Sequence, residues 1–192
     1  MKRFQVADVM SKDVVTVQPV ARVSDIVSML TNCTHNGFPV VADGEDGRSR
    51  MVGMVLRSDM ITLLQNRIWG ELRNDSTDQT TLAPVQFLKK YPQRVAISDV
   101  ALPPIETTDN LWLDLQPYMN PTPFTMPPHA MLPRMFRLFR SMGLRHVPII
   151  DEDGALVGII TRTELTSFKM HDMMHAFDAS HHQADQEGHH GH

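Results

Sequence analysis

Residues 157–164 (VGIITRTE) and residues 52–59 (VGMVLRSD) are two versions of one pattern, 105 positions apart. Each begins with an apolar run of strand type and ends in polar residues typical of a helix start. Working outward, residues 38–41 (FPVV) match residues 147–150 (VPII) at an offset of 109. The chain therefore contains an internal repeat. This repeat decides the fold, because stacked copies bury an apolar face that one copy cannot bury alone.

Each copy reads as β-α-β-β-α, which predicts an α+β fold of two such repeats packed with pseudo-twofold symmetry. In the first copy the β-branched run at residues 14–17 predicts a strand that ends before Pro19. Ser24 and Asp25 can cap the following helix, and Gly37 ends it. Two strands and a helix follow, at residues 38–41, at 51–56 and from 58 onward. The second copy predicts strands at residues 123–126, 147–150 and 156–160, with helices at 130–142 and from 163.

The repeat divides the chain into five segments. The middle of the connection, residues 73–81, is polar and has no apolar period, so we expect a mobile loop there. The end of the chain is rich in His, Gln, Asp and Gly, and we expect it to be disordered. The predicted segments are a lead-in at 1–7, a first repeat at 8–66, a partly mobile linker at 67–116, a second repeat at 117–170 and a His-rich tail at 171–192.

Composition excludes several classes of protein. The 192 residues carry a net charge of −4, which gives no electrostatic case for nucleic acid. No run approaches the roughly 20 apolar residues that a membrane span requires, and the N-terminus has no signal-like apolar stretch. We therefore expect a soluble piece of protein. Cys33 is the only cysteine, so no internal disulfide can form.

The junction at Thr161 and Glu164 is the first candidate binding feature. A buried strand runs into a helix start there, and the free backbone N–H groups of a helix start favour anionic oxygen. A carboxylate in the first turn can also accept hydrogen bonds from both hydroxyls of a ribose. The same residues fit a capping box, in which Glu164 only caps its own helix. Both interpretations remain open on the sequence alone.

The segment around Gly37 is the second candidate. A glycine lets the backbone approach a flat group closely. Exposed backbone groups there can read the edge of an adenine, while His35 or Phe38 stacks on its face. The alternative is a helix C-cap glycine followed by a core strand.

Together the two motifs resemble a tandem CBS-domain pair. More narrowly, residues 36–41 (NGFPVV), 118–125 (YMNPTPFT) and 138–146 (LFRSMGLRH) resemble the cytoplasmic C-terminal region of eukaryotic chloride channels and transporters. The endosomal–lysosomal branch, which is similar to chloride/proton exchangers, matches best. The resemblance implies that a transmembrane transport domain of the same polypeptide precedes Met1. It also implies a homodimer on the cytosolic face of an endosomal or lysosomal membrane.

The resemblance further implies an adenine nucleotide as a regulatory ligand in one cleft between the repeats, with no metal required. ATP is the expected nucleotide, with ADP or AMP as alternatives. The first repeat would hold the adenine, Glu164 would bind the ribose, and Thr161 and Arg162 would lie near the sugar and phosphate. The implied binding residues are Val14, Val15, His35, Asn36, Gly37, Phe38, Pro39, Thr161, Arg162 and Glu164.

This chain departs from the family pattern at two of these positions and differs between its own repeats. His35 stands where relatives carry an aromatic residue, and Glu164 replaces their usual aspartate. Leu56 occupies the position of Thr161 in the first repeat, so the opposite cleft, near Asp59 and His146, lacks a hydroxyl. We therefore predict one nucleotide site per chain.

Two other functions compete with nucleotide sensing. The pair could be a nucleotide-free platform for dimerisation and docking on the same transporter. An enzyme is the third hypothesis, but no phosphate-binding loop of the G-x-x-x-x-G-K type and no kinase-like catalytic set is present, so we expect none. His171 and His175 are spaced for a metal, but without a third ligand we predict a solvated tail and no metal site.

Overall fold

The computed structural model describes residues 4–73, 76–77, 97–101 and 110–168. These residues form two compact units, each of which is described by itself. The first-repeat unit contains residues 14–124 together with 152–156, and the second-repeat unit contains residues 4–13, 125–151 and 157–168. Each unit therefore combines one repeat with a segment from elsewhere in the chain.

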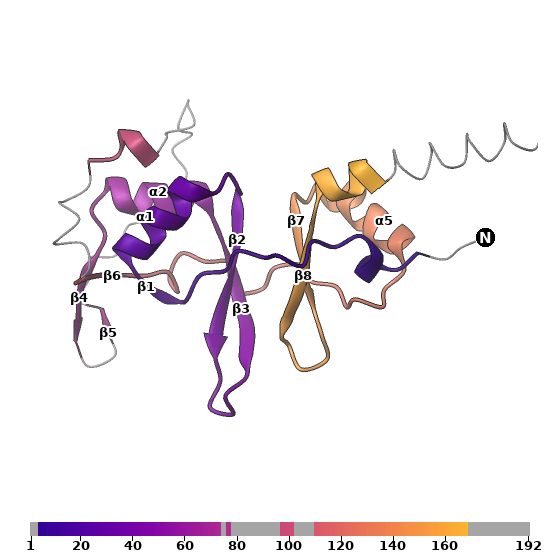
Figure 1. The fold of residues 1–192 in the computed structure, drawn as a ribbon, viewed down its shortest axis with the longest axis horizontal. Helices are drawn as coiled ribbons and strands as arrows, with labels where there is room; N and C mark the ends of the chain where they lie inside the picture. The colour runs from indigo at the N-terminus through magenta and orange to yellow at the C-terminus, as the bar shows by residue number, and fades with distance from the viewer. Residues whose placement is uncertain (1–3, 74–75, 78–96, 102–109, 169–192) are drawn as a thin grey trace, which may run out of the picture. The chain divides into compact units, whose positions relative to one another are not determined.

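In its described residues, the first-repeat unit has two small sheets and two α-helices (Figure 1). Strands β2 and β3 form an antiparallel hairpin with Gly37 opposite Leu56. A second sheet has the strand order β1-β6-β4-β5. The bounds are β1 (Val20–Arg22), α1 (Val23–Asn32), β2 (Gly37–Asp43), β3 (Ser49–Leu56), α2 (Arg57–Gln65), β4 (Gly70–Arg73), β5 (Ser76–Thr77), the 3₁₀ turn η2 (Ile97–Asp99) and β6 (Leu111–Asp114).

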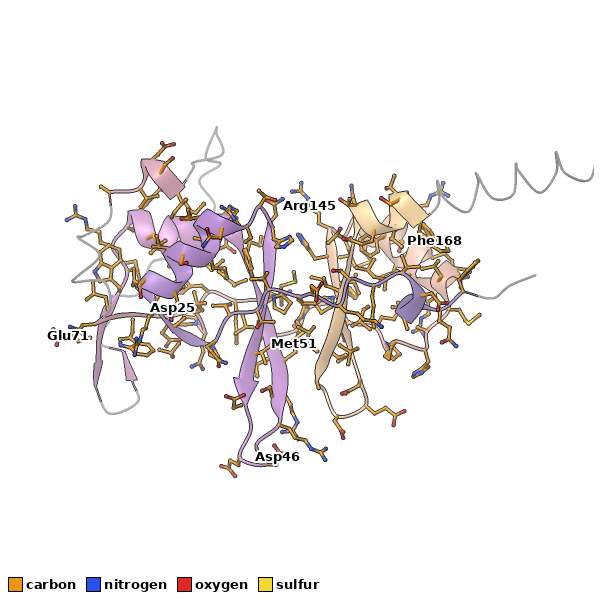
Figure 2. All side chains as sticks on the ribbon, viewed as in Figure 1. Asp25, Asp46, Met51, Glu71, Arg145 and Phe168 are labelled. Atoms are coloured by element: carbon orange, nitrogen blue, oxygen red, sulfur yellow. The ribbon has the colours of Figure 1, made fainter. Side chains whose placement is uncertain are left out.

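The core of this unit lies between the helices and the β2–β3 hairpin. Helix α1 buries Val23, Ile26 and Leu30, which recur at helical spacing and so face one side. Phe38 from β2 and Leu113 from β6 belong to the same cluster of buried side chains. The tip of the hairpin carries charge instead: Figure 2 shows Asp46 there, and Arg50 Nη2 donates to its Oδ2 at 2.5 Å.

The second-repeat unit also combines a two-stranded sheet with helical segments. Its elements are the 3₁₀ turn η1 (Val6–Asp8), helix α5 (Leu132–Met142), a two-stranded sheet of β7 (His146–Ile150) and β8 (Leu156–Thr161), and a helical segment at residues 162–168. A proline in the first turn fits the start of α5, since its missing N–H would have no partner there. Gly143 ends α5 in the left-handed conformation, at φ 63°, as the sequence predicts.

Each unit includes residues from the start of the other repeat. Ser11 and Ile159 exchange two backbone hydrogen bonds of 2.9 Å in the second-repeat unit. Asn120 and Met54 exchange bonds of 2.8 and 2.9 Å in the first-repeat unit. The buried Val6 belongs to the second-repeat core. Residues 4–13, which include the start of the first predicted repeat, thus pack with the second repeat, and the start of the second predicted repeat, up to Phe124, packs with the first.

The structure corrects several local predictions. The runs at residues 14–17 and 123–126 are not regular strands, because only Val17 and Met126 pair, in parallel with Val40 and Ile149. Ser24 and Asp25 do not cap α1, because the helix starts at Val23 with Arg22 in the N-cap position. Gly37 does not end α1: the helix stops at Asn32, and Gly37 is the first residue of β2. Arg73 and residues 76–77 lie in β4 and β5 instead of a loop. The rest of residues 73–81, and the tail, lie outside the described residues.

None of the helices in the described ranges is both long and apolar enough to cross a membrane.

Candidate functional site

The junction of β8 with the helix at 162–168 is organised around the Glu164 carboxylate. Its Oε2 accepts a hydrogen bond of 2.8 Å from the Thr161 backbone N–H and another from the Thr161 hydroxyl. The hydroxyl in turn accepts a bond of 3.2 Å from the Thr163 N–H. This is the helix-capping arrangement that the sequence left open. The cap fixes a carboxylate and a hydroxyl side by side, and both residues are half-buried.

Arg162, which the resemblance placed near sugar and phosphate, is bound to its own repeat. Its Nε donates to the Leu144 carbonyl at 2.9 Å, and its Nη2 donates to the Gly143 carbonyl at 3.1 Å. The guanidinium therefore closes the C-terminal end of α5. A contact with phosphate would require the exposed part of the guanidinium to reach beyond these carbonyls.

The segment at residues 35–39 presents its first two residues outward. His35 and Asn36 are exposed, whereas Gly37 and Pro39 are buried. Phe38 is 0% exposed and belongs to the first-repeat core, so its ring cannot stack on an adenine. His35 is the ring that can, and it lies edge-on to Phe38 at a centroid distance of 6.4 Å. The expectation of a stacking role for Phe38 is therefore wrong.

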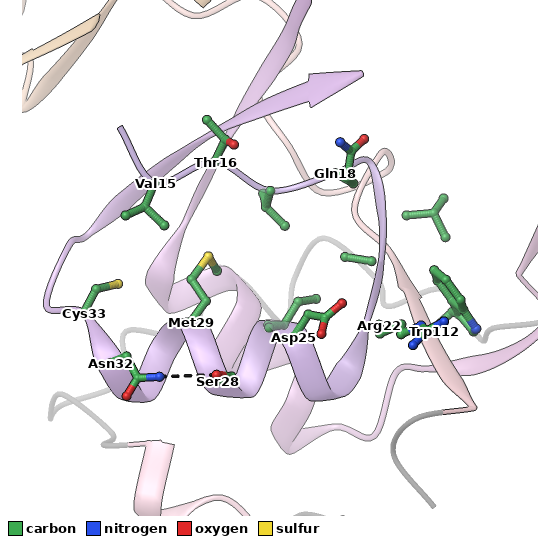
Figure 3. Close-up of a pocket in the computed structure, with 14 residues that line it drawn as sticks. Val15, Thr16, Gln18, Arg22, Asp25, Ser28, Met29, Asn32, Cys33 and Trp112 are labelled. Carbon is green, nitrogen blue, oxygen red and sulfur yellow. Dashed lines mark hydrogen bonds between the residues drawn. The ribbon is translucent and has the colours of Figure 1, made fainter. Parts of the chain in front are cut away.

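Val15 lies where the chain passes over helix α1, at one end of a cavity of about 640 Å³ (Figure 3), and Val14 precedes it in sequence without lining the cavity. The cavity lies wholly within the first-repeat unit and has Trp112 at its far end. Val15 is 36% exposed. The lining is mainly apolar: Val15, Thr16, Val17, Gln18, Val20, Ala21, Arg22, Asp25, Ile26, Ser28, Met29, Asn32, Cys33 and Trp112.

Two residues of this cavity could not be found from local sequence. Arg22 places its guanidinium 5.2 Å from the centre of the Trp112 ring, a cation–π contact. The contact depends on the pairing of β1 with β6, in which Arg22 lies opposite Trp112. No motif near either residue indicates this pairing, because the two strands are far apart in sequence.

The equivalent junction in the first repeat has the same cap and a different surface. Leu56 takes the place of Thr161 and is 44% exposed. Burial raises the pKa of Asp59, while hydrogen bonds from Ser58 and from the Leu56 backbone lower it in part. Asp59 thus accepts from the Leu56 backbone as Glu164 does from that of Thr161, but the hydroxyl beside it is that of Ser58, which donates to Asp59 Oδ1 at 3.3 Å, and the position of Thr161 carries none.

No group of three metal-binding side chains occurs within the part of the chain that the structure describes. His171 and His175 lie outside that part.

Comparison with known proteins identifies the repeats. The model of the CBS domain matches residues 6–66 and 114–171. The chain belongs to the CBS domain family. It carries two CBS repeats, and the α+β fold predicted from the repeat is confirmed.

Curated relatives of this CBS pair are chloride-transport proteins. The H(+)/Cl(−) exchange transporter 7 of Mus musculus is 37% identical over 166 residues, which are 85% of this chain and 20% of the transporter. The chloride channel protein CLC-d of Arabidopsis thaliana is 30% identical over 158 residues, 81% of this chain and 20% of that protein. The chain thus spans about a fifth of the length of these relatives.

Among solved structures, the CBS pair is similar to CBSX2 of Arabidopsis thaliana in complex with AMP. The TM-score is 0.56 at 22% identity, over 88% of this chain and 98% of CBSX2. At this identity the likeness shows the fold.

Proposed function

We propose that this CBS pair is the regulatory domain of a chloride channel or chloride/proton exchanger and binds one adenine nucleotide. Its relatives in sequence are transporters many times its length, and CBSX2 was solved with AMP. The observation that carries the proposal is the Thr161–Glu164 junction, where a hydroxyl and a carboxylate are fixed together at a helix start. In the first repeat Leu56 stands in the place of Thr161 and leaves that position without a hydroxyl, so one site per chain is proposed.

In this proposal the first repeat holds the adenine and the second repeat holds the ribose. His35 stacks on the base, and the backbone of residues 36–39 reads its edge. Val14 and Val15 provide the apolar wall, next to the cavity along α1. Glu164 accepts hydrogen bonds from the ribose hydroxyls, and Thr161 and Arg162 lie toward the phosphates. Exposure of His35, Asn36 and Val15 in the first-repeat unit supports this arrangement.

A nucleotide that touches both repeats favours the relative arrangement of repeats that binds it more tightly. The same rule sets the size of any effect on transport, because a ligand shifts an equilibrium only by its difference in affinity for the two states. We propose that the attached transport domain responds to this shift, in a homodimer on the cytosolic face of an endosomal or lysosomal membrane. ATP is the proposed ligand, with ADP and AMP as alternatives.

Isothermal titration of ATP, ADP and AMP into the purified chain tests the proposal. We expect one site per chain and a loss of affinity of tenfold or more in Glu164→Ala, since each tenfold loss corresponds to about 1.4 kcal/mol. Asp59→Ala is the matched control, because Asp59 holds the position of Glu164 in the repeat that has Leu56 in place of Thr161. It should leave nucleotide affinity unchanged.

Absence of heat at millimolar nucleotide, with Glu164→Ala giving the same trace, would remove the sensor. The remaining function would then be a nucleotide-free platform for dimerisation and docking. Light scattering with and without ATP measures that role directly.

A further inference from the structure

The loop between α1 and β2 is held from inside the first-repeat unit by Arg57. Its Nη1 donates to the Cys33 carbonyl at 2.9 Å and to the His35 carbonyl at 3.4 Å. Its Nη2 donates to the Leu30 carbonyl, in the last turn of α1. The Arg57 backbone N–H also donates to the Asn36 carbonyl at 3.0 Å. One residue at the start of α2 thus fixes four carbonyls along residues 30–36.

The second repeat contains the same device. Arg162 is the counterpart of Arg57 and donates to the carbonyls of Gly143 and Leu144, in the corresponding loop after α5. The two helices end differently, since Cys33 is extended at φ −130° and Gly143 is left-handed at φ 63°. The arginine contacts recur although the helix ends differ. Their recurrence indicates that the arginine has a function of its own in holding this loop.

We propose that Arg57 is a positioning residue that sets base selection in the nucleotide site. This inference rests on the proposed function, in which residues 35–39 read the adenine. Arg57 does not touch the base. It fixes the carbonyls of Cys33, His35 and Asn36, and thereby the direction in which the loop presents its backbone groups to the edge of the base.

A lysine cannot replace this guanidinium. Arginine carries five N–H donors spread over a rigid plane, whereas a lysine ammonium is a single point charge. A lysine in this position would retain the charge near the C-terminal end of α1, which is favourable there. It would lose the simultaneous contacts with Leu30, Cys33 and His35. Arg57→Lys therefore separates loop positioning from charge.

The test is titration of ATP and of inosine triphosphate, which differs from ATP at the 6-position of the base, into the full chain. We expect the wild type to prefer ATP and Arg57→Lys to lose about tenfold of that preference, the effect of one well-made hydrogen bond. A merely structural role would weaken both nucleotides equally and leave their ratio unchanged. Arg48→Lys is the control, because Arg48 makes an exposed ion pair with Asp153 at 3.0 Å, far along the hairpin.

Hydrogen exchange of the unliganded chain provides a second measurement that needs no nucleotide. Arg57→Lys should speed exchange of the Cys33 amide, which donates to the Met29 carbonyl at 3.1 Å, by about tenfold or more if the loop opens locally. Arg162→Lys should leave exchange of the Cys33 amide unchanged. Arg57→Gln, which keeps a neutral donor, is measured in parallel should the lysine variant unfold.

Three outcomes overturn the inference and are distinguishable. If the wild type prefers ATP and Arg57→Lys keeps both the preference and the slow exchange, only the role of Arg57 is wrong. Equal weakening of both nucleotides reduces Arg57 to a stability residue. If the wild type binds neither nucleotide, the proposed function fails, and the base-selection role fails with it.

Discussion

The two repeats share a scaffold down to single hydrogen bonds. Val17 pairs with β2 by donating to Pro39 and accepting from Val41, at 3.1 and 3.0 Å. Met126 makes the same two bonds with Pro148 and Ile150 in the second repeat, at 3.2 and 3.1 Å. In both units a methionine side chain also packs next to a strand glycine. Met119 lies next to Gly53 of β3, and Met10 lies next to Gly158 of β8.

The repeats differ where a ligand would meet them. Thr161 and Glu164 correspond to Leu56 and Asp59, and the small His35–Gly37 corner corresponds to the bulkier Leu144, Arg145 and His146. Val15 corresponds to Phe124, which is 48% exposed. The comparison teaches that packing constrains both copies equally, while the exposed corners are free to diverge. The second repeat thus keeps a hydroxyl at Thr161, where the first repeat has the apolar Leu56.

The largest expected effect tests the shared scaffold. A Cβ on Gly53 would lie 2.9 Å from the Asn120 carbonyl oxygen, and one on Gly158 would lie 2.9 Å from the Ser11 carbonyl oxygen. Backbone must move in both cases, so Gly53→Ala and Gly158→Ala should each lower the free energy of unfolding by about 1–3 kcal/mol. Chemical denaturation of the full chain measures both.

The lower free energy of unfolding in Gly53→Ala could come from a clash with a methionine side chain or from a clash with backbone, and a double variant separates these causes. The Cβ on Gly53 would also lie 2.7 Å from Met119 Sδ, a flexible side chain. Shortening that side chain in Gly53→Ala/Met119→Ala should not restore stability, because the Asn120 carbonyl stays in place. If one glycine accepts alanine freely while the other does not, the two repeats are not equivalent in packing.

The next effect concerns the difference between the repeats. Thr161→Val keeps the side-chain shape and removes the hydroxyl, so ATP affinity should fall about tenfold, as expected for one lost hydrogen bond beside a charge. Leu56→Thr supplies a hydroxyl in the first repeat. It should not create a second site, because Arg145 and His146 still fill the corner that His35–Gly37 leaves open.

Titration calorimetry gives both the affinity and the number of sites. Two tight and equal sites in the wild type, or a second site in Leu56→Thr, would contradict the asymmetry. The thermal midpoint of Thr161→Val is the accompanying control, since the Thr161 hydroxyl also contributes to the helix cap.

Much of this fold can be predicted from the sequence, because the same pattern of apolar and turn residues occurs in both repeats and each element is therefore indicated twice. The β2–β3 hairpin, α5 and its glycine end follow from apolar period and turn residues. The cap at Glu164 was one of two interpretations, and the structure shows that the cap forms. Whether the ribose also binds there stays a prediction, because the structure describes the two units separately.

What the sequence did not predict depends on contacts between distant residues. The pairing of β1 with β6 joins Arg22 to Trp112, and nothing local at either residue indicates it. The segment at residues 14–17 has strand composition but meets β2 only at Val17. Phe38 looked available as an exposed aromatic residue, yet alternation along β2 does not hold, because its first four residues are all buried. The contacts of Arg57 could not be predicted, because they depend on where α1 ends in space relative to the start of α2.

The smallest expected effect uses pH to examine the first-repeat cap. Burial raises the pKa of Asp59 above its ordinary value of 3.8, so the folded chain binds this proton more tightly than the unfolded chain does. The resulting stabilisation is fully present below the unfolded pKa and is lost as pH rises through the folded pKa.

Asp59→Asn removes this pH dependence of stability. Its free energy of unfolding should therefore exceed that of the wild type at neutral pH, by an amount that shrinks toward zero as pH falls below 3.8. A wild type that gains stability over Asp59→Asn as pH rises would show that the hydrogen bonds from Ser58 and Leu56 outweigh burial at Asp59.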